Sequence, residues 1–315
     1  MNQKKVDLVI VNWNSGFQLE DAVKSINQRY HAAVSSVIIV DNGSTDDSLD
    51  RVAALLGLFF KLIIIKNIEN RGFGAACNQG AELTENEFIL FLNPDTRLFE
   101  DSLLLPLAFL EREENSRVGI LGIQLIDESQ QIARSCARFP TAVGIINHAL
   151  GLDRLMPSLG HFMREWDHAT TRPVDHVIGA FFLLRNSTFI AIGGFDETFF
   201  VYLEDLDFSY RAKQVGWSSV FFAEAQAFHA GGGTSRQVMA KRLYYSLRSR
   251  ILYAYKHFNP VAASLVLLVT FFIEPIVRTG FAIFRRSWSS IGETWLAYRM
   301  LFRWLPEWIL KGTTR

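Results

Sequence analysis

The sequence of 315 residues predicts an α/β fold whose mostly parallel sheet is covered by helices on both faces. Short, continuous apolar runs recur through the first hundred residues, and segments with helical periodicity separate them. Strands that are buried on both faces lose the alternation of apolar and polar residues, so these runs are typical of a parallel sheet. Three of the runs also end in a cluster of polar residues, as ligand-binding sheets of this kind often do.

The expected elements follow one another in a regular order. The first strands are Val6–Asn12, 37–40, 62–66 and Phe88–Leu92, and helices are expected between them at 17–27, 46–57 and 74–83. The next part of the chain is less regular, with helices at 101–114 and 204–215 and strands at 118–125, 177–185 and 219–229. The last eighty residues are expected to be helical.

Composition and charge narrow the class of protein. With 49% hydrophobic and 20% charged residues, the chain is not intrinsically disordered. Its two cysteines, Cys77 and Cys136, exclude a disulfide framework and a cysteine-based tetrahedral zinc site. The net charge of zero combines two unlike parts, because residues 236–315 carry +10 and residues 1–235 carry −10. This asymmetry indicates an acidic body and a basic tail with different tasks.

The polar clusters 12–15, 41–44 and 93–95 each follow an expected strand. Because the carboxyl ends of parallel strands meet at one edge of a sheet, we expect the three clusters to face a single crevice. Turn and capping chemistry explains most of the cluster after Asp41, yet a carboxylate at the strand end can also accept hydrogen bonds from a nucleobase or ribose. Asp95 has two readings as well, as a turn residue or as a ligand of a divalent cation that also binds diphosphate oxygens.

The segment 70–78, NRGFGAACN, is a glycine-rich turn that opens a helix. It lacks both the dinucleotide-binding G-x-G-x-x-G and the P-loop pattern. Its small residues allow a helix to pack closely on the sheet, while Arg71 and the neighbouring backbone also suit a phosphate group. Both interpretations stay open.

Two further features carry reactive groups. Glu204, Asp205 and Asp207 lie behind an aromatic run, either as a solvated acidic first turn of a helix or as a source of a general base. His229 ends an expected strand before the glycine-rich segment 231–233, either as a packing residue or as a ligand of a metal such as Mn²⁺.

These features suit the transfer of a glycosyl group from a nucleotide sugar. The sequence resembles the family 2 glycosyltransferases of the Rossmann-like GT-A fold and, within them, bacterial rhamnosyltransferase-type members. The matching stretches are VIVNWNS, IIVDNGSTDDS, NRGFGAACNQG, FLNPD, IGAFFLLRNSTFIAIGGFDETFFVYLEDLDFSYRAKQVGW and FHAGGGTS, in family order over residues 5–235.

The resemblance implies a role for each candidate residue. Asp41 contacts the nucleobase, and the other nucleotide-sugar-binding residues are Asn12, Asn14, Asn42, Arg71, Gly72, Asn78 and Asn93. Asp95 and His229 bind Mg²⁺ or Mn²⁺, with Asn93 in place of the first aspartate of the family's D-x-D. Asp205 is the catalytic base, and Glu204 supports it or binds the acceptor. The Gln-x-x-Arg-Trp motif of processive synthases is missing, since Met300 replaces its glutamine, which favours addition of a single sugar.

We therefore expect an inverting, metal-dependent hexosyltransferase of cell-envelope polysaccharide biosynthesis. The expected donor is dTDP-rhamnose, and the expected acceptor is a hydroxyl of a polyprenyl-diphosphate-linked sugar or of a polysaccharide, with Arg134 and Arg138 as candidate pocket residues. Residues 1–98 form the nucleotide-sugar-binding half and residues 99–235 the acceptor half of the catalytic domain. The alternatives are a sugar nucleotidyltransferase and a catalytically silent membrane scaffold with the same fold.

Residues 236–315 are expected to form a basic, aromatic, membrane-associating region. Four of the seven tryptophans lie between Trp288 and Trp308, with basic residues between them, as is typical of an interfacial helix. The apolar run 261–273 is shorter than the roughly 20 residues that cross a bilayer, so peripheral attachment to the cytoplasmic face of the bacterial inner membrane is expected. Packing on the catalytic domain or on a second subunit, as in a homodimer, is the alternative. No recognition motif for nucleic acid accompanies the tail.

Overall fold

The computed structural model describes residues 6–30, 32–231 and 238–314. The chain divides into two compact units. The first, which we call the sheet unit, comprises Met1–Ala137, Trp166–Asp196 and Asp205–Thr234. The second, the helical unit, comprises Arg138–Glu165, Glu197–Glu204 and Ser235–Arg315. The helical unit thus takes in two earlier segments besides the C-terminal region that the sequence marked off at residue 235.

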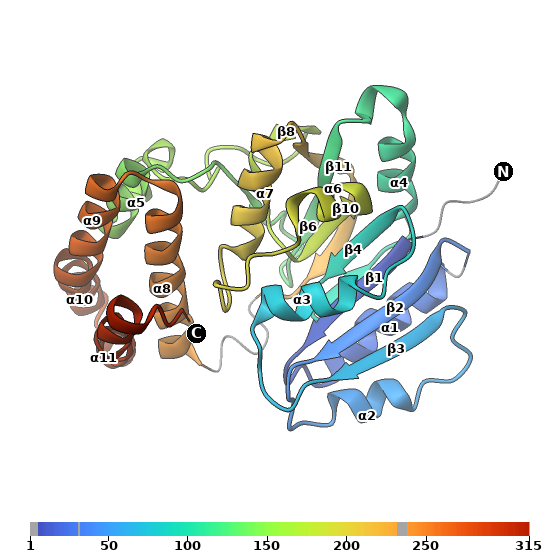
Figure 1. Cartoon of the computed structure of the whole chain (residues 1–315), viewed down its shortest axis with the longest axis horizontal. Coiled ribbons are helices and arrows are strands. Elements are labelled where there is room, and N and C mark those ends of the chain that lie inside the picture. Colours follow the sequence, from blue (N-terminus) through green and yellow to red (C-terminus); the bar gives the residue numbers. More distant parts are fainter. Residues whose placement is uncertain (1–5, 31, 232–237, 315) are drawn as a thin grey trace. The chain divides into compact units, whose positions relative to one another are not determined.

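The sheet unit is built on a nine-stranded sheet in the order β3-β2-β1-β4-β10-β6-β11-β5, with β8 paired to β11 (Figure 1). Its strands are β1 (Val6–Asn12), β2 (Val34–Asp41), β3 (Lys61–Lys66), β4 (Phe88–Leu92), β5 (Thr96–Leu98), β6 (Val118–Ile126), β8 (Arg172–Val174), β10 (Phe181–Arg185) and β11 (Ser218–His229). A second, two-stranded sheet pairs β7 (Cys136–Ala137) with β9 (His176–Val177).

The predicted parallel pairing is confirmed among β1, β2, β3 and β4. The other half of the sheet is mixed, because β10 runs antiparallel to both of its neighbours, β4 and β6. β11 is parallel to β6 but antiparallel to β5 and β8. The α/β class is therefore as predicted, with parallel order confined largely to the first hundred residues.

Helices cover both faces of this sheet (Figure 1). They are α1 (Phe17–Arg29), α2 (Ser48–Ala53), α3 (Phe73–Ala81), α4 (Leu104–Glu111), the 3₁₀ turn η1 (Glu113–Asn115), α6 (Asn186–Ile192) and α7 (Glu204–Gln214). α2 begins at Ser48 rather than at 46, because the Asp46 carboxylate accepts hydrogen bonds from the backbone N–H and the hydroxyl of Ser48. Such a side-chain contact is typical of the residue before a helix rather than within it.

Alternate residues of β1 face the two layers of helices, as the period of a strand requires. Leu8 and Ile10 join the core cluster that also holds residues of α1 and α4. Val9 faces the other layer, where α3 approaches so closely that a Cβ on Gly80 would lie 2.4 Å from a Val9 methyl carbon. Gly80, two residues beyond the segment 70–78, thus allows α3 to pack closely on the sheet. On the same face, ring contacts join Phe91, Phe182, Phe189, Phe195 and Phe208.

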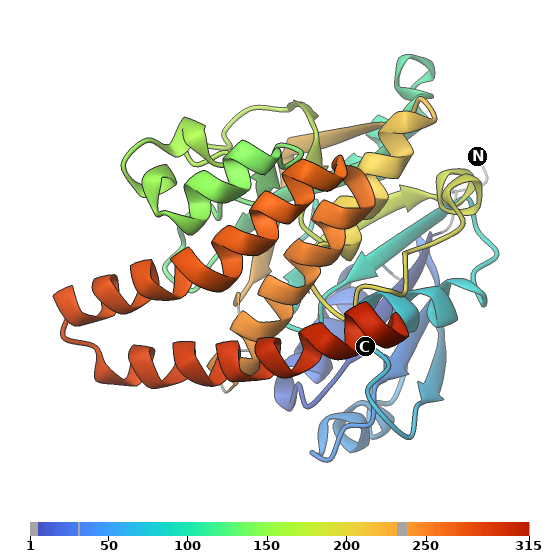
Figure 2. The same cartoon turned by 60° about the vertical axis from the view of Figure 1, so that its left-hand side comes forward.

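The helical unit contains α5 (Ala142–Ala149), the 3₁₀ turns η2 (Leu152–Arg154) and η3 (Pro157–Leu159), α8 (Met239–His257), α9 (Pro260–Leu268), the π-helical segment η5 (Val269–Ile273), α10 (Glu274–Phe284) and α11 (Trp288–Lys311). The segments α9, η5 and α10 follow without a break, and α11 then turns back alongside them (Figure 2). The helical character predicted for the tail is confirmed.

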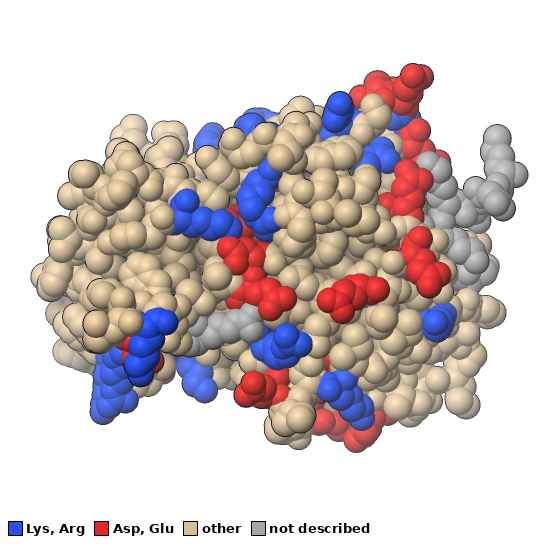
Figure 3. Space-filling model, viewed as in Figure 1, with Lys and Arg blue, Asp and Glu red and all other residues tan. Residues whose placement is uncertain are grey.

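Among the described residues, one helix, Pro260–Phe284, is long and apolar enough to cross a membrane by length and composition alone. It exceeds the apolar run read from the sequence because it continues through Glu274 and Pro275. One third (33%) of its most apolar window is buried inside the protein. On the face drawn in Figure 3, Asp and Glu lie over the sheet unit with Lys and Arg among them, whereas the part formed by α8–α11 is mostly uncharged.

Candidate active site

The carboxyl ends of β1 and β2 form the first part of the candidate site. The parallel register places Asn12 beside Asp41, and the Asn12 amide donates hydrogen bonds to the Asp41 carboxylate (2.7 Å) and to the Ser48 hydroxyl (2.8 Å). The other Asp41 oxygen accepts the backbone N–H of Ser44 at 3.1 Å. Two donors therefore fix a buried carboxylate at the strand end. The predicted meeting of these two polar clusters is confirmed.

The side-chain oxygen of Asn12 is an acceptor without a donor among the described residues. This oxygen is buried and, within the described part of the chain, no donor lies within hydrogen-bonding distance. A buried acceptor without a donor is costly, and such groups in native folds usually have a ligand or water as partner. This edge of the sheet is thus suited to a ligand that offers an N–H or O–H group, as nucleobases and ribose do.

The remaining predicted nucleotide-binding residues surround this edge. Asn42 is buried, donates to the Gly72 carbonyl (3.1 Å) and accepts from Asn67 (2.9 Å), so it joins β2 to the glycine-rich turn. Asn14, at φ 52°, accepts the Thr45 N–H at 2.7 Å. Arg71 precedes Gly72 and is partly exposed. Gly72 itself has φ 89°, a left-handed conformation that glycine adopts without strain.

Asn78 and Asn93 each form hydrogen bonds with the backbone of another segment. Both ends of the Asn78 amide bond the backbone of Phe195, each at 2.9 Å, and so tie α3 to the turn after α6. Asn93 follows β4, and its backbone N–H donates to the Ala180 carbonyl at 3.0 Å. Their roles in binding a nucleotide sugar stay predictions.

Asp95 and His229 meet at the paired strands β5 and β11. The His229 Nε2 lies 3.4 Å from the Asp95 Oδ1, and the side chains are 13% and 9% exposed. Neighbouring ligands of one cation stand about 3 Å apart when each is bound at about 2.1 Å, so these two atoms fit a shared divalent ion. No group of three or more His, Cys, Asp or Glu side chains suited to a metal occurs among the described residues. Any ion here would take its remaining ligands from other groups, such as water or diphosphate oxygens. The segment 232–237, with most of the glycine run after His229, lies outside the described residues.

Asp205 occupies the first turn of α7. Its Oδ2 accepts the Gly179 backbone N–H at 2.8 Å, and its Oδ1 accepts the Leu206 N–H at 2.8 Å. The side chain is 17% exposed. These contacts fix the orientation of the carboxylate while leaving part of it open, as a general base requires.

Two residues that lie beside Asp205 were not predicted from the sequence. A Cβ on Gly179 would lie 3.2 Å from Asp205 Oδ2, so the glycine makes room for the carboxylate. His176 Nε2 lies 3.6 Å from the same oxygen, and its Nδ1 lies 3.1 Å from the Ser209 hydroxyl. Burial lowers the pKa of His176 in spite of the opposing charges of Asp205 and Asp175. The only available signal was the spacing H-x-x-G on the strand that approaches this site.

The segment before Asp205 is strained and firmly held. Tyr202 and Leu203 have φ values of 69° and 67°, which cost side-chain-bearing residues of order 1–3 kcal/mol each. Within the helical unit, Phe200 stacks on Tyr245 at 4.8 Å, and the Ser249 hydroxyl donates to the Val201 carbonyl at 2.8 Å. Helix α8 therefore shapes the segment that leads into Glu204, a buried residue, and then into Asp205.

The roles of Arg134 and Arg138, the two arginines expected in the substrate pocket, stay predictions. Arg134 is exposed. Arg138 belongs to the helical unit and forms an ion pair with Glu165. The structure thus brings together Asn12 with Asp41, and Asp95 with His229, and it places Asp205 in a backbone cradle.

Comparisons with known proteins show which family this sequence matches and which solved structures share its fold. The model of the family described as "Glycosyl transferase family 2" matches residues 7–193. The N-acetylglucosaminyl-diphospho-decaprenol L-rhamnosyltransferase of Mycobacterium tuberculosis is 28% identical over 235 residues, covering 70% of this chain and 75% of the relative. Rhamnosyltransferase WbbL of Escherichia coli is 28% identical over 172 residues, covering 54% of this chain and 62% of its own.

A similar fold is found in the mannosyltransferase PcManGT from Pyrobaculum calidifontis, which was solved in complex with GDP-Man and Mn²⁺. The TM-score is 0.58 at 15% sequence identity, and the match covers 95% of this chain and 87% of that one. At this identity the likeness concerns the fold alone. The family model, in contrast, spans more than half of the sequence and includes the strand ends that carry Asn12, Asp41 and Asp95. This chain belongs to glycosyl transferase family 2.

Proposed function

We propose that this glycosyltransferase moves one rhamnose from dTDP-rhamnose to a hydroxyl of a polyprenyl-diphosphate-linked acceptor, with inversion at the anomeric carbon. The rhamnosyl group rests on the names of both rhamnosyltransferase relatives, and the polyprenyl-diphosphate-linked acceptor on the name of the mycobacterial one. The dTDP carrier rests on the family resemblance alone. The observation that carries the proposal is the combination of a fixed carboxylate at Asp205 with the Asp95–His229 pair. This combination also favours an active glycosyltransferase over a silent scaffold, and family membership disfavours a nucleotidyltransferase.

The reaction assigned to these residues is a single displacement. The acceptor oxygen forms a bond to the anomeric carbon, the bond from that carbon to the diphosphate oxygen breaks, and Asp205 takes the hydroxyl proton. The hydrogen bonds from Gly179 and Leu206 keep the carboxylate aimed while this happens. Asp95 and His229 would hold Mg²⁺ or Mn²⁺, which supplies positive charge against the departing diphosphate. Asp41 and Asn12 would hold the nucleoside.

Localisation is part of the proposal. We assign the protein to the cytoplasmic face of the bacterial inner membrane, attached peripherally through the helical unit. Two properties of that unit support this. α10 and α11 expose large apolar side chains, among them Phe284 (86% exposed) and Trp288 (75%), and residues 236–315 carry a net charge of +10.

A two-step experiment tests the proposed function. Thermal shifts with UDP-, GDP- and dTDP-sugars, each with Mg²⁺ or Mn²⁺, identify the donor, and we expect dTDP-rhamnose to stabilise the protein most. Transfer to a polyprenyl-diphosphate-linked sugar is then compared in wild type, Asp205→Asn and the control Asp101→Asn, which changes an exposed carboxylate. Asp205→Asn should abolish transfer and keep the thermal shift. Substantial turnover by Asp205→Asn would rule out Asp205 as the base, and stabilisation by another sugar nucleotide would overturn the donor.

A further inference from the structure

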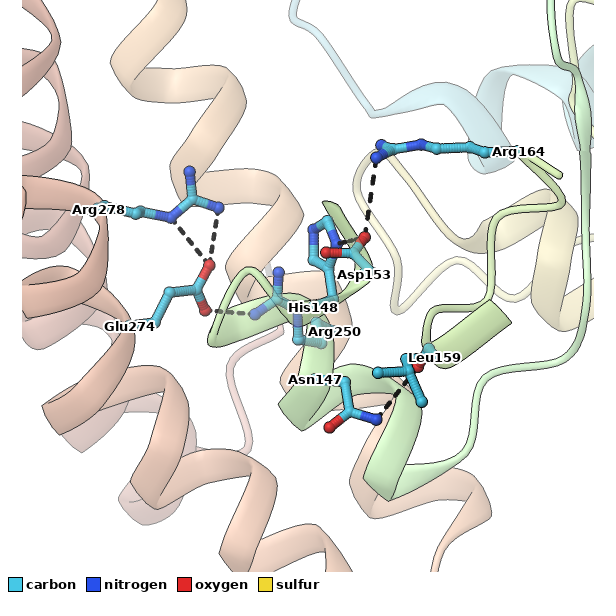
Figure 4. Close-up of polar contacts among 8 residues, drawn as sticks. All are labelled: Asn147, His148, Asp153, Leu159, Arg164, Arg250, Glu274 and Arg278. Carbon is cyan, nitrogen blue, oxygen red and sulfur yellow. Dashed lines mark hydrogen bonds and ion pairs between the residues drawn. The ribbon is translucent and has the colours of Figure 1, made fainter. Parts of the chain in front are cut away.

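The helical unit contains a cavity of about 200 Å³ between the segment of α5 and η2 on one side and α10 and α11 on the other. Its polar lining includes Arg154, Arg278, Arg285, Ser287, Ser290 and Thr294. Figure 4 shows the ion-pair network beside it, in which Glu274 meets Arg278 and Arg250 while His148 meets Asp153. None of these residues belongs to the candidate active site, so the cavity needs its own explanation.

The charge of Glu274 is already satisfied. This carboxylate is 1% exposed, and one oxygen accepts from Arg278 at 2.7–2.8 Å while the other is bound by Arg250. Burial alone would raise the pKa of Glu274, but the two guanidinium groups outweigh it and hold that pKa below its ordinary value. The guanidinium groups of Arg250 and Arg278 thus neutralise the Glu274 carboxylate. Glu274 leaves no negative charge for other partners.

Two other arginines of the lining form no ion pair with a described residue. Arg154 places its guanidinium 4.8 Å from the centroid of the Phe281 ring, and Arg285 follows the last residue of α10. Within the described part of the chain, no carboxylate lies at ion-pair distance from either guanidinium. Burial lowers the pKa of the neighbouring His148, which disfavours a positive charge on its imidazole. The lining therefore carries a net charge of +2 from three arginines and one glutamate.

Hydroxyl groups and a helix start complete the polar side of the cavity. The Ser287 and Ser290 hydroxyls lie 2.7 Å apart, and the Thr294 hydroxyl donates to the Ser290 carbonyl at 2.7 Å. Ser287 precedes the 24-residue helix α11 and makes no side-chain cap bond. Arginine guanidinium groups and hydroxyls gathered in one cavity are donors that bind phosphate groups in proteins.

The elements that line the cavity also expose large apolar side chains. Leu155 (82% exposed) follows Arg154, whereas Phe284 (86%) precedes Arg285 and Trp288 (75%) follows Ser287. Exposed apolar residues beside cationic ones favour a ligand that combines an anion with hydrocarbon. A membrane lipid has this chemistry, and a soluble phosphate compound does not.

We propose that this cavity binds the phosphate group of an anionic membrane lipid, with Arg154 and Arg285 as its charge partners. Leu155, Phe284 and Trp288 enter the interfacial layer of the same membrane. The inference rests on the proposed membrane attachment and is independent of the sugar-transfer chemistry.

Binding of the full-length protein to vesicles tests this site. The vesicles are phosphatidylcholine alone, phosphatidylcholine with phosphatidylglycerol, and phosphatidylcholine with a polyprenyl diphosphate. The variant Arg154→Gln/Arg285→Gln is compared with Arg299→Gln/Arg303→Gln, a control on α11 that removes the same charge from exposed positions outside the cavity lining. Salt at about 0.5 M screens diffuse surface attraction more than contacts in a cavity.

At this salt concentration we expect the cavity variant to lose about tenfold or more in vesicle affinity and the control less than about threefold. Retention by phosphatidylglycerol would identify a phospholipid headgroup as the ligand, and stronger retention by polyprenyl diphosphate would identify the carrier lipid. Equal losses in both variants would overturn the site. Stabilisation by inorganic pyrophosphate without retention on either anionic vesicle would overturn a lipid ligand. The thermal shift with nucleotide sugar should be unchanged in both variants, which separates this inference from the proposed function.

Discussion

The imidazole Nε2 of His229 lies 3.4 Å from the Asp95 Oδ1, although the two residues are far apart in the sequence. The antiparallel pairing of β11 with β5 sets this distance, because it aligns His229 with Thr96, the neighbour of Asp95. One carboxylate and one imidazole thus face the same point, and both are mostly buried. Because of this contact, Asp95 and His229 together form a candidate pair of metal ligands.

We expect Asp95→Asn and His229→Ala each to lower kcat by at least about 100-fold, because either change removes half of the protein ligands of the proposed ion. Chelation should have a similar effect on wild type, and added Mn²⁺ should restore its activity. Transfer assays over a range of Mn²⁺ concentrations measure this, with Asp101→Asn as control. Activity that survives chelation would show that no metal is needed.

Gly179→Ala should reduce turnover without unfolding the protein. The added Cβ would lie 3.2 Å from Asp205 Oδ2, so the carboxylate must shift by a few tenths of an ångström. Misplacement of a catalytic group is costly, and we expect kcat to fall roughly 10- to 100-fold with a smaller change in KM. Gly280→Ala is the matched control, since a Cβ there meets no atom within 4 Å. Equal kinetics in the two variants would argue against a precise placement of Asp205.

Stability should fall as the pH drops below about 6.5. Burial lowers the pKa of His148, His168 and His176 from their ordinary value of 6.5 in the folded chain. Below pH 6.5 these histidines bind protons more readily in the unfolded chain than in the folded chain. The free energy of unfolding therefore decreases progressively as the pH falls below 6.5. In His176→Gln, the free energy of unfolding should decrease less steeply with falling pH, by up to about 1.4 kcal/mol per pH unit. Melting temperatures from pH 5 to 8 measure it, and identical slopes would contradict the prediction.

Glu274→Gln should destabilise the helical unit strongly. The change leaves Arg250, which is 7% exposed, without its carboxylate, and breaking a buried ion pair costs about 3–5 kcal/mol. The double variant Arg250→Met/Glu274→Leu removes both buried charges, so its free energy of unfolding should decrease much less. Arg278, which also loses its partner there, is 30% exposed and can turn to solvent. Denaturant unfolding compares the two. A double variant as unstable as Glu274→Gln would show that the pair is not the cause.

Trp288→Ser should weaken attachment to anionic vesicles about 10- to 100-fold, since a large apolar side chain that enters the interface contributes about 1.5–3 kcal/mol. Leu56→Ser is the control, because Leu56 is 92% exposed on the sheet unit. Vesicle sedimentation measures both variants. Point changes suit this test better than removal of the tail, because α5 packs against α9 within the helical unit and would lose its cover.

Much of the sheet unit was readable from local patterns. Continuous apolar runs and the polar residues after them predicted β1, β2 and β4, and the meeting of Asn12 with Asp41 followed from parallel pairing. The antiparallel β10 was not foreseen, because a buried strand has the same composition in either direction. The extra segments of the helical unit were missed for a similar reason, since nothing local in 138–165 records which surface that stretch will cover.

The sequence by itself determined the α/β class, the family resemblance and the acidic carboxylates at the strand ends, because these depend on residue type and on spacing over a few positions. Only the tertiary structure decided which distant groups meet. Pairing of β11 with β5 brings His229 to Asp95, and the approach of residue 179 to α7 gives Asp205 its backbone donor and His176 as a neighbour. It also decided that Arg154 and Arg285 share a cavity whose lining carboxylate among the described residues, Glu274, pairs with Arg250 and Arg278 instead. Long-range packing creates such contacts, and no short stretch of sequence records them.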